Sequence, residues 1–372
     1  MLKVSFMKTM FVFGTRPEAI KLAPIILESK KYFDTVVCVS EQHKEMLYQV
    51  TDFFNINIDY NLHIMKNSQS LFDITSNILI KIKSIYEKEK PDIVIVQGDT
   101  TTAFAAALSA FYLKIKIAHV EAGLRSFDLF NPYPEEANRK LISAIATYHF
   151  APTKLAYDNL QNEGIKKNVY LTGNSVVDAL HLILEKLEIE NTHFDVFKDI
   201  DFTKRIILFT SHRRESFGKP MRSIFEAIKQ IAQEFDDVEI VYPVHLNPNV
   251  KNLAFEMLTG FKNIKLTKPL TYPEFVYILS KSYLVITDSG GVQEEAPAFG
   301  IPVLVIRNTT ERQEGIVANI AKLVGTNTQK IYNEAKLLLT DLDFYKSMSN
   351  RVNPYGDGKT SQRIINILKE LK

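Results

Sequence analysis

Short runs of branched and aromatic residues alternate along the chain with longer stretches of helical periodicity, and this alternation constrains the fold more than any other feature. In the first half, the predicted strands are 9–13, 35–39, 93–97, 115–120 and 148–151. The pattern restarts in the second half, with predicted strands 205–210, 239–244, 264–266, 283–287 and 302–306. Strands separated by helices are typical of parallel α/β sheets. The sequence therefore predicts an α/β protein with two Rossmann-like, doubly wound domains.

The length of 372 residues also favours two domains, because it exceeds what one core usually supports. A polar, charge-rich stretch, "EKLEIENTHFDVFKDIDFTK", follows a predicted helix over 176–187. We place the N-terminal domain at 1–173 plus 361–372, since the last amphipathic helix is expected to cross back, and the C-terminal domain at 174–360. The first six residues are expected to be an extension. Two such sheets facing each other would gather their strand ends around one cleft.

Composition excludes several classes of function. A formal charge of +2 leaves no strong basic field, which argues against nucleic-acid binding and for a small anionic partner. The single cysteine, Cys38 in "TVVCVS", is predicted to be a buried strand residue and permits no internal disulfide, which fits the cytoplasm. No segment is long enough to span a membrane, and the histidines lack metal-site spacing, so we expect neither a membrane span nor a metal.

The first predicted strand runs into Gly14-Thr15-Arg16-Pro17, and Pro17 suits the first turn of a helix. Arg16 and Lys21 can therefore lie near a helix N-terminus, which is a common anion site. Two solvated charges on an ordinary helix are the alternative. The turn lacks the G-x-G-x-x-G pattern, which weakens a dinucleotide interpretation, and we expect no cofactor.

Carboxylates follow the next two strands. Asp99 ends one strand in "QGDTTT", Glu121 ends its neighbour in "HVEAGLRS", and Glu135 follows Pro134 at a predicted helix start. Adjacent strand ends bring Asp99 and Glu121 within reach of each other, which favours acid–base chemistry. Two alternatives stay open: Asp99 as a helix N-cap, and structural ion pairs with Arg125 and Arg139.

The second domain repeats this arrangement with basic side chains. "SHRRE" follows its first strand and contains His212 and Arg213, whose guanidinium group suits phosphate oxygens. His245 ends the following strand in "VYPVHLNP". A histidine packed under a loop is the alternative, although the neighbouring arginines make it less persuasive.

The stretch "TDSGGVQEEA" combines an anion-binding turn with two carboxylates. Amides of the turn can approach a diphosphate closely, and Glu294 or Glu295 can accept hydrogen bonds from ribose hydroxyls. Both features fit a nucleotide sugar, while an acidic helix cap fits Glu294 better than Glu295. The turn consists of Ser289, Gly290 and Gly291, and the neighbouring loops contribute Phe275 near the expected base position and Arg312 at the adjacent strand end.

Together the motifs "FGTRPEAIK", "GDTTT", "HVEAGLR", "PYPEEANR", "HRRESFG", "PVHLNP", "TDSGGVQEEAP", "TTERQEG" and "NPYGDGK" resemble the non-hydrolysing UDP-N-acetylglucosamine 2-epimerases, from about Met7 onward. The resemblance implies a GT-B-like fold, a homodimer, and interconversion of UDP-GlcNAc and UDP-ManNAc for bacterial surface polysaccharides. It further implies that UDP is eliminated to leave 2-acetamidoglucal and is then added back.

The resemblance also assigns roles to matching positions. It implies a catalytic group of Asp99, Glu121, Glu135 and His212. It implies binding residues Arg16, Lys21, His245, Phe275, Ser289, Gly290 and Glu295, beside Arg213, Gly291 and Arg312 from the turn chemistry above. A hydrolysing relative that releases free ManNAc and a glycosyltransferase of the same architecture are the alternatives.

Some members of that family bind a second UDP-GlcNAc as an activator through a "QHRQM" segment and an arginine before a later glutamine. The matching positions here are Gln42, His43 and Gln69. Glu45 and Ser68 replace an amide and the cation, so allosteric activation is not the favoured expectation.

Overall fold

The computed structural model describes residues 7–42, 44–65 and 69–370, which form two compact units. The first unit runs to Ala179 and resumes at Gly356, and the second is Leu180–Tyr355. The chain first changes unit inside helix α7 (Ser175–Ile189), at Ala179 rather than at the predicted Gly173. It returns at Gly356 rather than at residue 361. The expected extension over 1–6 lies outside the described residues.

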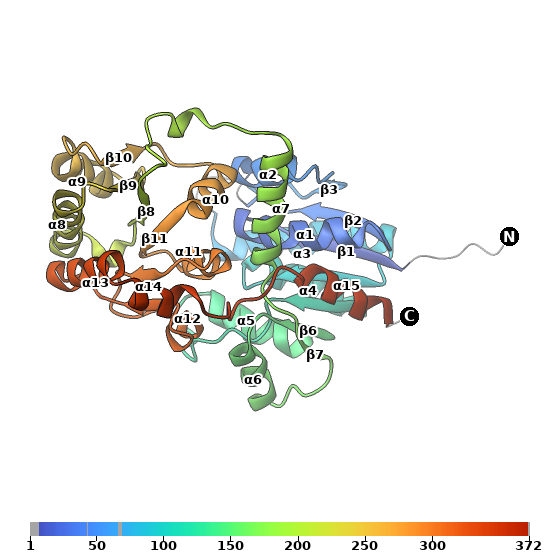
Figure 1. Cartoon of the computed structure of the whole chain (residues 1–372). Helices are drawn as coiled ribbons and strands as arrows, with labels where there is room; N and C mark the ends of the chain where they lie inside the picture. The colour runs from blue at the N-terminus through green and yellow to red at the C-terminus, as the bar shows by residue number, and fades with distance from the viewer. Residues whose placement is uncertain (1–6, 43, 66–68, 371–372) are drawn as a thin grey trace. The chain divides into compact units, whose positions relative to one another are not determined.

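Unit 1 is built on a parallel sheet that has seven strands among its described residues, in the order β3-β2-β1-β4-β5-β6-β7 (Figure 1). The strands are β1 (Lys8–Phe13), β2 (Asp34–Val39), β3 (Tyr60–Asn61), β4 (Ile93–Gln97), β5 (Lys116–Val120), β6 (Tyr148–Ala151) and β7 (Val169–Leu171). The helices are α1 (Arg16–Ser29), α2 (Lys44–Phe53), α3 (Leu71–Glu89), α4 (Thr101–Tyr112), α5 (Glu135–Ile145), α6 (Lys154–Asn162), the first part of α7, and α15 (Thr360–Glu370).

Alternation along the strands of unit 1 creates two apolar faces. Met10 and Val12 point to the face covered by α3 and α4, where Ile78 and Ile82 are fully buried. The alanine-rich α4 has little side-chain bulk, so it packs closely against both α3 and the sheet. On the other face α15 packs beside α1 (Figure 1), as expected for a C-terminal helix that crosses back.

Unit 2 has a second parallel sheet, with described strands in the order β10-β9-β8-β11-β12-β13. They are β8 (Arg205–Thr210), β9 (Val238–Pro243), β10 (Ile264–Thr267), β11 (Ser282–Thr287), β12 (Val303–Val305) and β13 (Ala321–Leu323). The helices are α8 (Lys219–Glu234), α9 (Pro248–Leu258), α10 (Tyr272–Ser280), α11 (Gly290–Glu295), α12 (Gln313–Val317), α13 (Thr328–Thr340) and α14 (Leu342–Ser349).

The strands predicted from the sequence are all present, with ends shifted by no more than about one residue. Three edge strands, β3, β7 and β13, were not predicted, because each has only two or three residues and shows no periodicity. Cys38 is buried in β2, as predicted. Within the described ranges, no helix is both long and apolar enough to cross a bilayer.

Candidate active site

Strand order reverses once in each sheet, between β1 and β4 in unit 1 and between β8 and β11 in unit 2. Doubly wound sheets bind ligands outside the carboxyl ends of their strands at this reversal. In unit 1 Arg16 begins α1 directly after the turn that follows β1, and the loop after β4 contains Asp99. In unit 2 the loops after β8 and β11 contain His212 and Ser289. Topology therefore places predicted site residues at the binding position of each sheet.

The turn between β1 and α1 is held by a buried glutamate that sequence analysis did not single out. Glu18 Oε2 accepts hydrogen bonds from the Gly14 and Thr15 amides, at 3.0 and 2.8 Å, and from the Thr15 hydroxyl. Its Oε1 accepts from the Thr100 hydroxyl at 2.7 Å, which ties the turn to the loop after β4. Burial raises the pKa of Glu18 to about 7, against the opposing effect of these hydrogen bonds. Arg16 is half-buried at the start of α1.

Asp99 is held at both its backbone and its carboxylate. Its Oδ2 lies 2.6 Å from Arg139 Nη2 and accepts a hydrogen bond from Arg139 Nε at 2.8 Å. Asn138 Nδ2 donates to the Asp99 carbonyl at 2.8 Å. Arg139 also forms an ion pair with the fully buried Glu136. The Glu136 carboxylate in addition accepts hydrogen bonds from the backbone amides of Ser126 and Phe127. These contacts fix Asp99 against α5.

The two other predicted carboxylates of unit 1 lie beside this network. Glu121 follows β5 with a positive φ of 64°, which is uncommon for a residue other than glycine, and its carboxylate pairs with Lys21 of α1. Glu135 begins α5, as predicted from Pro134, and its buried Oε2 has no hydrogen-bond partner among the residues that the structure describes. The structure therefore places Asp99 and Glu121 just after the neighbouring strands β4 and β5, and Glu135 at the start of α5. Lys21 contacts one of these carboxylates.

The structure decides between alternatives that the sequence left open. Thr100, rather than Asp99, caps α4, because its hydroxyl accepts from the Ala103 amide at 3.0 Å. Arg139 forms an ion pair with Asp99, but Arg125 does not: its buried side chain binds Glu163. His119 Nε2–H donates to the Gly98 carbonyl at 2.7 Å, directly before Asp99, and burial lowers the pKa of His119 to about 3.

In unit 2 a buried aspartate organises the loop after β8. Asp288 Oδ2 accepts hydrogen bonds from the backbone amides of His212 and Arg213, at 2.7 and 2.8 Å. The Ser211 hydroxyl donates to the same oxygen at 3.3 Å. Tyr242 Oη–H donates to the Ser211 carbonyl at 3.0 Å, which supports the loop from β9. The loop geometry is thus fixed by the strands on either side of β8.

His212 and His245 stack, with ring centroids 5.5 Å apart and planes 18° from parallel. Burial, together with the neighbouring His212, lowers the pKa of His245. His245 Nδ1 accepts a hydrogen bond from the Asn247 amide at 3.1 Å, so the neutral ring carries its proton on Nε2. The two imidazoles predicted at strand ends therefore lie together in the structure.

Ser289, Gly290 and Gly291 lie at the start of α11, as predicted. A Cβ added at Gly290 would lie 3.7 Å from Arg213 Nη2 and 3.8 Å from the Arg312 guanidinium carbon. Two guanidinium groups therefore approach the amides of this turn. Within the described part of the chain, the buried Arg213 Nε has no hydrogen-bond partner, which leaves a donor for an anion. This part of unit 2 can bind phosphate oxygens.

The two glutamates of the same stretch have different partners. Arg312 Nε donates to Glu294 Oε1 at 2.6 Å, so Glu294 orients a guanidinium group and does not cap the helix. Tyr272 Oη–H donates to Glu295 Oε1 at 2.9 Å, and both side chains are buried. Phe275 is half-buried in α10 and packs against one of the unit's apolar cores, which is an ordinary structural setting.

Two of the residues that match the activator segment of some family members, Gln42 and Gln69, are among the described residues. Gln42 Oε1 accepts a hydrogen bond from the Thr102 hydroxyl at 3.2 Å, and Gln69 Nε2 donates to the Ile64 carbonyl. His43 and Ser68 lie outside the described residues. Among the residues that are described, no group of three or more histidine, cysteine, aspartate or glutamate side chains is arranged to hold a metal.

Comparison with known proteins decides the family. The model of the UDP-N-acetylglucosamine 2-epimerase family matches residues 26–369. The chain belongs to this family. It is 50% identical over 371 residues to the UDP-N-acetylglucosamine 2-epimerase of Campylobacter jejuni, covering 97% of each chain, and 50% identical over 362 residues to that of Bacillus subtilis, covering 96% of this chain and 94% of the relative.

A solved UDP-GlcNAc 2-epimerase has the same fold. The crystal structure of the enzyme from Neisseria meningitidis bound to UDP-GlcNAc superposes with a TM-score of 0.89 at 46% identity, covering 98% of this chain and all of that one. The likeness confirms the predicted class of two Rossmann-like α/β domains. Membership of the 2-epimerase family makes the chain an enzyme, and UDP-GlcNAc 2-epimerase is its activity.

Proposed function

We propose that the chain interconverts UDP-GlcNAc and UDP-ManNAc without net hydrolysis, by eliminating UDP to give 2-acetamidoglucal and adding it back. The observation that carries the proposal is the placement of Asp99 and Glu121 at the carboxyl ends of the neighbouring strands β4 and β5, with Glu135 at the start of α5. A relative solved with UDP-GlcNAc supports the substrate.

Inversion at C2 demands proton transfer on both faces of the sugar ring. The C2 proton is weakly acidic, so a base must remove it while the C1–O bond breaks and the electron pair leaves with the diphosphate. For the return step a proton must be donated to the opposite face of C2. Asp99, Glu121 and Glu135 supply carboxyl groups for both faces, and Lys21 and Arg139 orient two of them.

Stabilisation of the departing diphosphate is the second requirement. We assign this role to the basic groups that approach the Ser289–Gly291 turn, because fixed donors stabilise charge that develops on a leaving group. They are Arg213 and Arg312, and we assign the Nε2–H of His245, which stacks on His212, as a further donor. Arg16 is assigned to the sugar diphosphate from unit 1. Glu295, held by Tyr272, is the acceptor for a ribose hydroxyl.

Exchange of the C2 hydrogen with solvent tests the mechanism. UDP-GlcNAc incubated with the enzyme in D2O is expected to give UDP-ManNAc that carries deuterium at C2, with little free sugar, as followed by proton NMR. Asp99→Asn is expected to slow label uptake by at least about 100-fold while UDP still binds. Asp158→Asn, on the exposed face of α6, is the matched control and should label normally. Unlabelled UDP-ManNAc would contradict the proposal.

The hydrolysing alternative predicts a different product. If water attacks the intermediate, free ManNAc and UDP accumulate together, and the reaction does not run backward from UDP-ManNAc. The same NMR time course distinguishes the two, because only the non-hydrolysing reaction reaches an equilibrium mixture of the two UDP-sugars.

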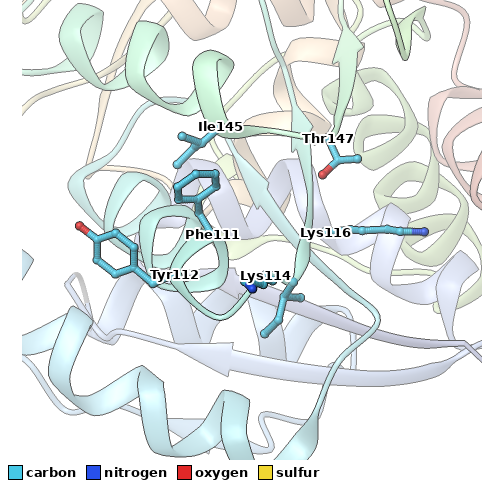
Figure 2. A pocket seen from close by; sticks show the side chains of 7 residues that line it. Phe111, Tyr112, Lys114, Lys116, Ile145 and Thr147 are labelled. Atoms are coloured by element: carbon cyan, nitrogen blue, oxygen red, sulfur yellow. The ribbon is translucent and has the colours of Figure 1, made fainter.

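We further propose that the enzyme works as a homodimer in the cytoplasm, supplying ManNAc units for surface polysaccharide. The association is supported by large apolar side chains left exposed on two packed helices: Phe72 and Ile80 on α3, and Phe111 and Tyr112 at the end of α4. Figure 2 shows Phe111 directed toward Ile145 in the pocket beside them. Exposed apolar groups on this scale commonly mark interfaces.

A further inference from the structure

Asp288 combines complete burial with an incomplete set of partners. Asp288 directly follows β11 and is 0% exposed. Oδ2 has three donors in the loop that holds His212, as described above. Oδ1, by contrast, has no hydrogen-bond partner within the part of the chain that the structure describes. A buried carboxylate oxygen without a donor is costly, so its surroundings identify the group it is built to meet.

That group is the imidazole of His212. Its Nδ1 lies 3.2 Å from Asp288 Oδ1, within the range of donor–acceptor distances for N–H···O hydrogen bonds. The His212 side chain is 39% exposed, so part of the ring is open to solvent. Because Nδ1 faces the carboxylate, Nε2 is the nitrogen left for a substrate.

Charge reinforces this geometry. Burial alone would raise the pKa of Asp288, but His212 and the two loop amides outweigh it and lower that pKa, so the carboxylate is ionised. An ionised carboxylate accepts hydrogen bonds and cannot donate one, so a neutral His212 must direct an N–H at it. The other titratable group facing the ring is the stacked His245, and the adjacent Arg213 guanidinium lies beside Gly290.

We propose that Asp288 is a positioning residue for His212, which holds the ring with the proton on Nδ1 and the lone pair of Nε2 directed to the substrate. The neighbouring His245 is held as the opposite tautomer by the Asn247 amide. The stacked pair therefore offers one accepting nitrogen and one donating N–H. The expected effect on catalysis rests on the proposed function. The assignment of the His212 tautomer does not depend on that function.

Nitrogen chemical shifts test the tautomer without any substrate. In histidine-labelled protein at a pH of about 8.5, where an ordinary imidazole is neutral, two-dimensional ¹H–¹⁵N spectra assign the protonated nitrogen of each ring. The wild type is expected to show Nδ1–H for His212. Asp288→Asn keeps an acceptor for the loop amides but places an N–H₂ group toward Nδ1, so His212 should change to Nε2–H. Nε2–H in the wild type would overturn the proposal.

Kinetics test the consequence. D288N is expected to lower kcat by at least about 100-fold with less than about threefold change in KM, as a wrong tautomer does in other aspartate–histidine pairs. In a His212→Gln background the same substitution should cost less than about threefold, because residues that act through one another are not additive. Additive losses would contradict the inference.

A matched control separates positioning from loop damage. Tyr242→Phe removes the support of the Ser211 carbonyl without touching the imidazole, and should lower the thermal midpoint while kcat falls less than about threefold. If Y242F and D288N reduce kcat equally, Asp288 is only a loop anchor. If the wild type shows Nδ1–H yet has no epimerase activity, the positioning stands and the proposed function fails.

Discussion

The buried carboxyl group of Glu18 connects two loops of the candidate site, and its burial disfavours the ionised form. Its carboxyl group is buried and bonded to Gly14, Thr15 and Thr100, so the turn of Arg16 and the loop of Asp99 share one anchor. Its pKa of about 7 lies above the ordinary value for glutamate, so the folded state favours the protonated form. Its contribution to stability is therefore present below about pH 4.5 and is lost as pH rises through about 7.

Glu18→Gln should remove this pH dependence, because the amide cannot ionise. Relative to E18Q, the wild type is expected to lose up to about 3 kcal/mol between pH 5 and pH 8, which is roughly 6 to 12 °C in thermal midpoint. Thermal unfolding of both proteins at several pH values measures the difference. Glu87→Gln, on the exposed surface of α3, is the control. A constant difference across this range would refute the expectation.

At the scale of elements, the packed helices α3 and α4 each present apolar side chains to solvent, although their inner faces are fully packed. Phe72 is 87% exposed and Tyr112 is 69% exposed. In a dimer these rings would be removed from water, which is the main driving force of most association. The α3–α4 surface is thus where the proposed homodimer can be tested.

Sedimentation equilibrium measures the mass of the protein in solution and so tests whether it is a dimer. The wild type is expected at about twice the chain mass of 42.5 kDa, and Phe72→Asp combined with Tyr112→Asp should shift it to the single-chain mass. Lys154→Asp, an exposed change on α6, should leave the mass unchanged. A doubly substituted protein that stays dimeric would place the interface elsewhere.

Sequence periodicity predicted the elements well, because buried parallel strands form continuous apolar runs. It also placed Asp99 and Glu121 after neighbouring strands, and β4 and β5 are indeed neighbours in the sheet, whereas the catalytic roles of Asp99, Glu121 and Glu135 stay a prediction. It did not reveal Asp288 or Glu18 as organisers. Each looks like an ordinary loop or helix residue, and its partners lie on other strands: 76 positions away for the His212 amide and 82 for the Thr100 hydroxyl. Only the folded chain shows such pairings.

For the whole molecule, the important feature is that unit 1 uses both ends of the chain. The N-terminus of α15 is capped by Asp178 of α7, whose carboxylate accepts from the Thr360 and Ser361 amides at 3.2 and 2.8 Å. The inner face of α15 is fully buried. Unit 1 therefore depends on a helix that follows all of unit 2 in sequence.

Ile365→Asp, which buries a charge under α15, is expected to destabilise unit 1 by at least about 3 kcal/mol. Asn366→Asp, on the exposed face of the same helix, should change it by less than about 0.5 kcal/mol. Hydrogen–deuterium exchange checks this, with faster exchange expected in β1 and β2 of I365D and no change in β8 and β11. Equal acceleration in both sheets would mean that the units unfold together.

This dependence reverses the order of maturation when the ribosome makes the chain. Residues 180–355 are contiguous, so that half has all its strands and helices as soon as they have left the exit tunnel. The half translated first stays incomplete until residues 360–370, which follow all of unit 2, have been released and can pack against α1. The carboxylates assigned to proton transfer therefore lie in the half that is completed last.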